Sequence, residues 1–159
     1  MENKTPFMPE IPEKEPQRQQ YFMAHAKEQL HILEENLGRP LTCCINTFGC
    51  QMNARDSEKL LGILETIGYQ AVETEDADFV LYNTCTVREN ANLRVYGRLG
   101  QLGARKKKHP HMMIALCGCM MQEKEVVEKI KKTYRFVELI VGTHNIFKLA
   151  ELVSLCLEE

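Results

Sequence analysis

The stretch LTCCINTFGCQMN, residues 41–53, passes from an apolar, strand-like segment through a glycine–cysteine turn into a helical pattern. The same succession recurs in FVLYNTCTV at 79–87 and in MMIALCGCMM at 112–121. The cysteines that follow these apolar segments are Cys50, Cys85 and Cys119. Strands that alternate with amphipathic helices are typical of a parallel sheet that is covered on both faces.

The periodicity of the chain predicts an α/β domain with three layers, of the Rossmann or flavodoxin-like kind. The expected strands are 41–48, 69–73, 79–84, 112–117 and 136–142. The expected helices are 53–67, 87–108, 122–134 and 144–157. The right-handed crossover rule then places the strand-to-helix loops at one edge of a mostly parallel sheet of about five strands.

The N-terminal residues differ in character from the domain expected at 41–159. Residues 1–16 hold four of the six prolines among charged residues, which predicts a flexible tail. Apolar residues at spacings of three and four predict a helix at 17–37. We therefore expect a helical extension over 17–40, which packs either on the domain or on a partner.

The composition is that of one globular domain. The chain has 159 residues, of which 44% are hydrophobic and 26% charged, with a net charge of -2. It has no apolar run of membrane-spanning length and no apolar signal-peptide region, so we expect a cytoplasmic protein without a membrane partner. In that reducing setting, seven cysteines favour metal binding or catalysis over disulfides.

The three cysteines after the strands form the first candidate site. Loops that follow parallel strands open onto one edge of the sheet, so Cys50, Cys85 and Cys119 are expected to meet there. Gly49 and Gly118 precede two of them and let the backbone approach a bulky inorganic group closely. The alternative for any single loop cysteine is a small, partly buried packing residue.

The number and spacing of these cysteines bear on the kind of metal. Thiolates suit iron–sulfur clusters, Zn²⁺ or Cu(I). Zinc sites commonly use paired C-x₂-C ligands, which this chain lacks. Three cysteines are one fewer than the set that usually holds an iron–sulfur cluster, and a missing ligand leaves an open coordination position for chemistry. The remaining cysteines, expected to serve in packing, are Cys43, Cys44, Cys117 and Cys156.

A second candidate site is the basic segment at 88–108, which has seven basic residues and one acidic residue. A positive patch on a slightly negative chain favours a polyanion such as RNA phosphate. The alternative is a solvated helix face whose cations stabilise the helix C-terminus. The candidate RNA contacts are Arg94, Arg98, Arg105, Lys106, Lys107 and Lys108.

From residue 41 onward the sequence resembles the N-terminal domain of the radical-SAM methylthiotransferases. The matching strings are TFGCQMNARDSEKL, YNTCTVRENA, GCMMQE and VGTHNI. GCQMN followed by NTCTVRENA is most similar to the tRNA branch, which methylthiolates N6-isopentenyladenosine beside the anticodon. The threonylcarbamoyladenosine tRNA branch and the ribosomal-protein branch are the alternatives within the family.

The resemblance implies that Cys50, Cys85 and Cys119 hold an auxiliary [4Fe–4S] cluster with one open iron, used in sulfur insertion. It assigns S-adenosylmethionine and a second [4Fe–4S] cluster to a radical domain with a CxxxCxxC motif, which this sequence lacks. We therefore expect an N-terminal fragment of a longer, monomeric transferase, without its radical-SAM domain and C-terminal RNA-binding domain. The fragment is expected to be inactive alone, and we assign it no catalytic side chain.

The expected partners are the tRNA anticodon stem-loop and the enzyme's own radical-SAM domain. Two rival functions remain. One is a non-catalytic zinc module in which His109 or His111 completes the three cysteines, although both precede a strand and belong to the opposite edge. The other is a doubly wound domain that binds a small anion or a nucleotide and uses its cysteines only for structure; the absence of a phosphate-loop glycine pattern counts against it.

Overall fold

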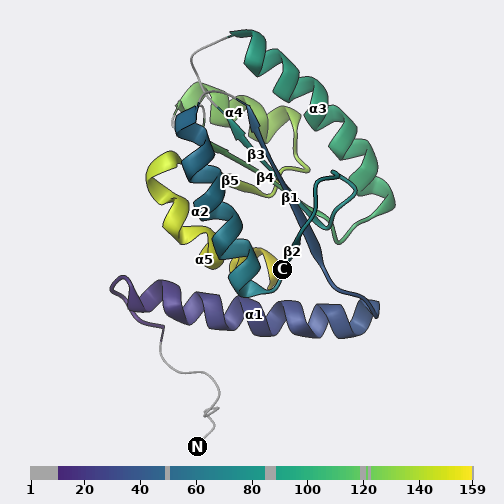
Figure 1. Ribbon diagram of the computed structural model, residues 1–159. Coiled ribbons are helices and arrows are strands. Elements are labelled where there is room, and N and C mark those ends of the chain that lie inside the picture. The colour runs from purple at the N-terminus through teal and green to yellow at the C-terminus, as the bar shows by residue number, and fades with distance from the viewer. Residues whose placement is uncertain (1–10, 49–50, 85–88, 119–120, 122, 159) are drawn as a thin grey trace, which may run out of the picture.

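The computed structural model describes residues 11–48, 51–84, 89–118, 121 and 123–158. In chain order the elements are α1 (Gln17–Leu37), β1 (Thr42–Phe48), α2 (Gln51–Ile67), β2 (Gln70–Ala71), β3 (Phe79–Thr84), α3 (Glu89–Lys108), β4 (Met113–Gly118), α4 (Lys124–Thr133), β5 (Leu139–Val141), the 3₁₀ helix η2 (Thr143–Lys148) and α5 (Leu149–Leu157). Figure 1 shows these elements wrapped around a central sheet. The α/β class predicted from the sequence is confirmed.

The described strands form one sheet in the order β2-β1-β3-β4-β5, and every neighbouring pair is parallel. The chain runs outward from β1 to β2 and then returns to β3 on the other side of β1. The strand order therefore reverses between β1 and β3. In open α/β sheets, ligands bind outside the carboxyl ends of the strands at this switch point.

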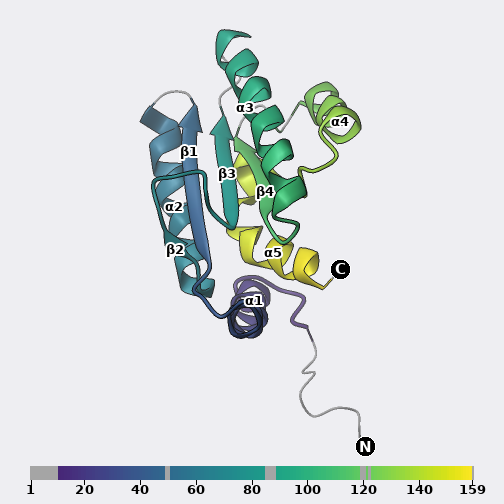
Figure 2. The same ribbon diagram turned by 90° about the vertical axis from the view of Figure 1, so that its right-hand side faces the viewer.

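Helices cover both faces of the sheet (Figures 1 and 2). One apolar core lies between the sheet and helices α1, α2 and α5, and a second lies between the sheet and helices α3 and α4. Successive strand residues alternate between the two cores, so Cys43 belongs to the first and Cys44 to the second. Every residue of β3 and β4 is buried, as expected for central strands covered on both faces.

Helix α1 is an integral part of the domain, which resolves the choice that the sequence left open. It lies across α2 and α5 below the amino ends of the strands (Figure 2). Phe22, Ala26 and Leu30 are buried in the core that α1 shares with these helices. Arg18 forms a two-bond ion pair with Glu151 of α5, with N–O distances of 3.0 and 2.8 Å.

Three predicted elements were wrong in their extent. The strand predicted at 136–142 covers only 139–141, because residues 134–137 form a turn that holds Phe136 against Gly103 of α3. The helix predicted at 144–157 is divided into η2 and α5, with a non-helical backbone at Asn145. The predicted strand at 69–73 is reduced to the two residues of β2.

Candidate functional site

The carboxyl ends of three adjacent strands lie in register at one edge of the sheet. Phe48 at the end of β1 pairs with Thr84 of β3, and Thr84 pairs with Gly118 of β4. In the sequence, the predicted ligands follow these three residues by two, one and one positions. The ligands themselves, Cys50, Cys85 and Cys119, lie outside the described residues. We call this end of the sheet, formed by the carboxyl ends of β1, β3 and β4, the cysteine edge.

Gly118 brings the ends of β3 and β4 unusually close together. Its φ is +120°, and a Cβ atom on it would lie 1.9 Å from the backbone oxygen of Thr84. The Thr84 hydroxyl donates a hydrogen bond of 2.9 Å to the Cys117 carbonyl. No other residue type fits here without movement of the backbone. The sequence predicted that Gly118 lets the backbone approach an inorganic group, whereas the close approach that the structure describes is to the neighbouring strand.

On the α2 side, one serine joins the ends of β1 and β3. The Ser57 hydroxyl lies 2.6 Å from the Thr47 hydroxyl and accepts a hydrogen bond of 3.0 Å from the Asn83 side-chain amide. Thr47 and Asn83 are direct register partners. Ser57 was not singled out from the sequence, and its contact with both strands is visible only in the structure.

On the α3 side, one carboxylate joins the same two strands. Glu75, in the loop between β2 and β3, accepts hydrogen bonds from Asn46 of β1 and from the Tyr82 hydroxyl of β3, the latter at 2.7 Å. It also forms an ion pair with Arg98 of α3. Asn46 and Tyr82 are register partners, one position before the pair that Ser57 joins. The strands at the switch point are therefore held from both faces.

The structure divides the predicted RNA contacts into two groups. Three of them are ion-paired with acids of the chain itself: Arg98 with Glu75, Arg105 with Asp76, and Lys106 with Glu138. The other three, which are exposed, are Arg94, Lys107 and Lys108. The acidic run ETEDAD at 73–78, between two predicted strands, was the sequence signal for two of these pairs.

The exposed cations lie at opposite ends of α3. Helix α3 begins beyond the carboxyl ends of the strands and runs down to their amino ends (Figure 2). At 1.5 Å per residue, Arg94 and Lys107 are separated by about 20 Å along the helix axis. Of the exposed cations of α3 in the described part of the chain, Arg94 is therefore the one nearest to the cysteine edge.

The cysteines predicted to serve in packing do so. Cys43, Cys44 and Cys117 are buried within strands, and Cys156 packs against the first core. Burial raises the pKa of the Cys43 thiol to about 12, and burial together with the Glu75 carboxylate raises that of Cys44. Both thiols are therefore protonated at neutral pH, in keeping with a packing role.

The two histidines of the rival zinc hypothesis, His109 and His111, lie at the opposite end of the sheet, where the strands begin, as expected. We call this end the amino edge. The Nε2 atom of His111 lies 3.1 Å from Asp78, directly before β3. The His109 ring contacts the His111 ring edge to face at 6.4 Å. Asp78 also accepts two hydrogen bonds from Arg39, of 2.8 and 2.7 Å, and one of 2.9 Å from the Thr42 backbone N–H. His111 thus contacts Asp78 at the end of the sheet opposite to the cysteine edge.

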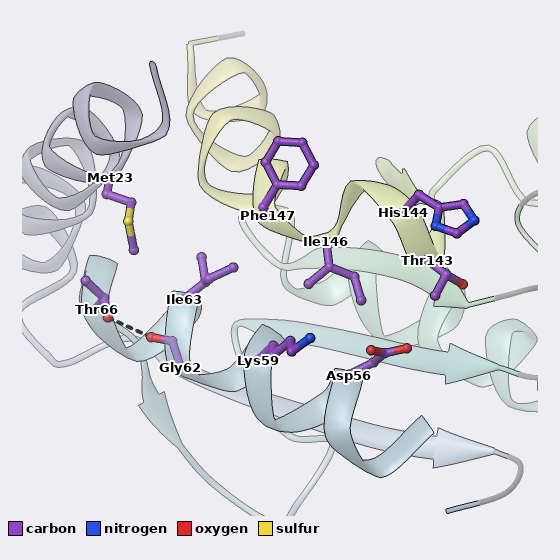
Figure 3. A pocket seen from close by; sticks show the side chains of 10 residues that line it. All are labelled: Met23, Asp56, Lys59, Gly62, Ile63, Thr66, Thr143, His144, Ile146 and Phe147. Carbon is purple, nitrogen blue, oxygen red and sulfur yellow. Dashed lines mark hydrogen bonds between the residues drawn. The ribbon is translucent and has the colours of Figure 1, made fainter. Parts of the chain in front are cut away.

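A groove of about 630 Å³ separates α2 from η2 and reaches α1 (Figure 3). Asp56 near the start of α2 and Thr143 and His144 after β5 line its polar end, which borders the cysteine edge. Ile63 and Phe147 line the apolar part that leads toward α1. Because Asp56, Thr143 and His144 come from elements that begin after strand ends, the polar end belongs to the ligand-binding side of the fold.

The donor chemistry of the cysteine edge fits a thiolate-bound cluster. Over the described ranges, no three His, Cys, Asp or Glu side chains are grouped so that they could hold a metal ion. The described residues at this edge supply amides, hydroxyls and the paired Glu75 carboxylate, none of which is a soft metal ligand. The described residues at this edge thus offer no soft donor of their own, and the sequence places cysteines directly after them.

In the part of the chain that the structure describes, every helix is too short or too polar to cross a lipid bilayer.

Comparison with known proteins identifies the family. Residues 42–142, more than half of the chain, match the family described as Uncharacterized protein family UPF0004. A tRNA-2-methylthio-N(6)-dimethylallyladenosine synthase from Lachnoclostridium phytofermentans is 70% identical over 131 residues, which cover 82% of this chain and 29% of the relative. Proteins with the same name from Acetivibrio thermocellus and Clostridioides difficile are 53% and 51% identical, over 86% and 80% of this chain.

The chain spans 29% of the length of the first of these curated relatives and 28% of the other two. The matched region begins at β1 and extends just beyond β5, so it contains the whole sheet and all three cysteine motifs. The chain belongs to UPF0004, the methylthiotransferase N-terminal domain family, as its cysteine motifs predicted.

Proposed function

We propose that this chain is the auxiliary [4Fe–4S] domain of an enzyme that methylthiolates N6-isopentenyladenosine beside the anticodon of tRNA. The observation that supports it most directly is the alignment of strand ends at the cysteine edge. Phe48, Thr84 and Gly118 are register neighbours, and each is followed within two residues by a cysteine. Cys50, Cys85 and Cys119 are the proposed ligands, and one iron remains open.

The contacts around the ends of β1, β3 and β4 support this proposal because they hold the three strand ends in fixed positions. A metal site requires ligands that are held in place by their surroundings. Ser57 and Glu75 join β1 to β3 from opposite faces, and Gly118 joins β4 closely to β3. The three strand ends are thus fixed relative to one another before the chain reaches its cysteines. When bound, the cluster supplies the site at which sulfur is presented to the substrate.

In this proposal the remaining chemistry belongs to a radical-SAM domain with a second [4Fe–4S] cluster, which binds S-adenosylmethionine. The curated relatives are more than three times as long as the part that this chain matches, which leaves room for such a domain. The enzyme acts as a cytoplasmic monomer on the tRNA anticodon stem-loop. Of the predicted RNA contacts, Arg94 is the strongest candidate because it is exposed and near the cysteine edge.

The test is the metal content of the anaerobically reconstituted chain. We expect iron and acid-labile sulfide in near-stoichiometric amounts for one [4Fe–4S] cluster per chain, with an EPR signal after reduction by dithionite. Cys50→Ala, Cys85→Ala and Cys119→Ala are each expected to abolish the cluster. Matched controls are Cys117→Ala, two residues from a proposed ligand, and Cys156→Ala on α5; both should retain it.

Other outcomes would contradict the proposal in distinct ways. Zinc without sulfide would favour the structural zinc module instead. A cluster that survives all three ligand substitutions would show that the site assignment is wrong. Methylthiolation of RNA by the 159-residue chain alone would overturn the division of labour between this domain and a radical domain.

A further inference from the structure

The Glu75–Arg98 ion pair lies beside the second core, against Phe48, the last residue of β1. Arg98 projects from α3 over the rings of Phe48 and Tyr82, with its guanidinium carbon 5.8 Å from each ring centroid. The two rings meet edge to face at 5.0 Å. Glu75 closes the arrangement through its ion pair with Arg98 and its hydrogen bond from Tyr82.

This arrangement is close in the chain to two proposed ligands. Phe48 lies two residues before Cys50, and Tyr82 lies three residues before Cys85. Two residues of fully extended chain span at most about 7 Å, and three span about 10 Å. Arg98 therefore lies over the two described residues that lead most directly into Cys50 and Cys85.

The pair lies at the boundary between the second core and solvent. The Glu75 side chain is 20% exposed and the Arg98 side chain 42% exposed. The apolar neighbours in the second core, such as Val95 and Leu99 of α3, are fully buried. Charges at such a boundary are screened less than those on an open surface. Each member of the pair currently compensates the other.

We propose that the Glu75–Arg98 ion pair is a positioning and charge-balancing element that sets the reduction potential of the auxiliary cluster. The inference rests on the proposed function, because it requires a cluster at Cys50, Cys85 and Cys119. One-electron reduction makes a thiolate-bound cluster more negative, so a nearby positive charge favours reduction and a negative charge opposes it. With both charges present, the opposing effects of Arg98 and Glu75 on the potential balance each other.

The proposal predicts shifts of opposite sign for the two members of the pair. Glu75→Gln removes the negative charge, leaves Arg98 uncompensated, and should raise the midpoint potential. Arg98→Met keeps an apolar stem over the two rings, leaves Glu75 uncompensated, and should lower the midpoint potential. The double variant should return to near the wild-type potential. A purely structural role would weaken the cluster in both single variants and give no such difference of sign.

The experiment is an EPR-monitored redox titration of the anaerobically reconstituted chain and its variants, with iron content and circular dichroism measured on the same samples. The matched control is Asp76→Asn, which removes the next acid along the chain. Asp76 is 71% exposed and pairs with Arg105, two helical turns further from the cysteine edge than Arg98. Its potential should equal that of the wild type.

The results separate this inference from the proposed function. A wild-type chain that holds no cluster overturns both. A wild-type cluster whose potential is unchanged in Glu75→Gln, or is shifted in the same direction by both single variants, overturns the inference and leaves the proposed function standing. Folded variants that no longer hold a cluster also overturn it, because the pair would then be needed to retain the cluster and would not act by setting its potential. If Arg98→Met does not fold, the direction of the change in midpoint potential in Glu75→Gln tests the inference, and a lowered potential overturns it.

Discussion

The two edges of the sheet use polar side chains in different ways. At the amino edge a single buried carboxylate, Asp78, collects hydrogen bonds from Arg39, Thr42 and His111. At the cysteine edge, polar groups join neighbouring strands in small sets, around Ser57 on one face and Glu75 on the other. The amino edge thus ties α1 and three strands into the fold. The cysteine edge fixes strand ends that lead into candidate ligands.

The largest effect on this comparison is expected from Gly118→Ala at the cysteine edge. A Cβ atom would lie 1.9 Å from the Thr84 oxygen, at a φ of +120° that other residues rarely adopt. We expect the strands to separate and the free energy of unfolding to fall by about 3 kcal/mol or more. Chemical denaturation of the apo chain measures this loss, and iron content after reconstitution should fall with it.

The control for that substitution is Gly100→Ala on the exposed face of α3. A Cβ atom at Gly100 would have no neighbour within 4 Å, and the backbone there is helical. Alanine should stabilise the helix by roughly 0.5–1 kcal/mol. Equal losses in both variants would mean that the close approach of Gly118 to Thr84 is unimportant for stability.

The next effect concerns Asp78→Asn at the amino edge. The asparagine cannot accept both hydrogen bonds from Arg39, so the free energy of unfolding at pH 7 should fall. We expect a loss of about 1–2 kcal/mol, allowing for solvent screening of the half-exposed arginine. The cluster content should stay at the wild-type level, since the substitution lies at the opposite edge. A loss of cluster would show that the two edges are coupled.

The contribution of Asp78 should depend on pH. Burial acts to raise the pKa of Asp78, but the hydrogen bonds from Arg39 and Thr42 lower it from 3.8 to about 2. A carboxyl with a lowered pKa in the folded state stabilises the protein above its unfolded pKa, and this stabilisation is lost as the pH falls through the folded pKa. The difference in stability between the wild type and Asp78→Asn should therefore be constant near neutral pH and shrink between about pH 4 and pH 2. Denaturation at a series of pH values tests this, and a constant difference across that range would contradict it.

The smallest effect separates the two ends of α3. Arg94→Glu near the cysteine edge should weaken tRNA binding by the full enzyme several-fold and reduce its salt dependence. Lys107→Glu, about 20 Å away along the helix, is the matched charge reversal and should have less effect. Arg98 and Arg105 form ion pairs with Glu75 and Asp76, so they should contribute less to tRNA binding than Arg94. If every one of these variants binds tRNA with the affinity of the wild type, α3 is not part of the RNA interface.

Much of this fold could be predicted because its signals are local. The apolar runs of β3 and β4 and the helical spacing of α1 and α2 placed these elements to within a few residues. The short β5 and the break at Asn145 could not be predicted, because they depend on Phe136 packing against Gly103 and on how η2 leaves the sheet. Contacts of that kind join residues that are distant in the sequence.

The sequence by itself determined the α/β alternation, the packing role of the strand cysteines, and the cysteine motifs that identify the family. Each of these depends only on residues that are close together in the chain. Only the tertiary structure decided the strand order, the place of α1 on α2 and α5, and the partners of the basic residues on α3. Glu75 shows the reason most clearly. It is one acid in an acidic loop until the fold brings it between Asn46, Tyr82 and Arg98, which come from three different elements.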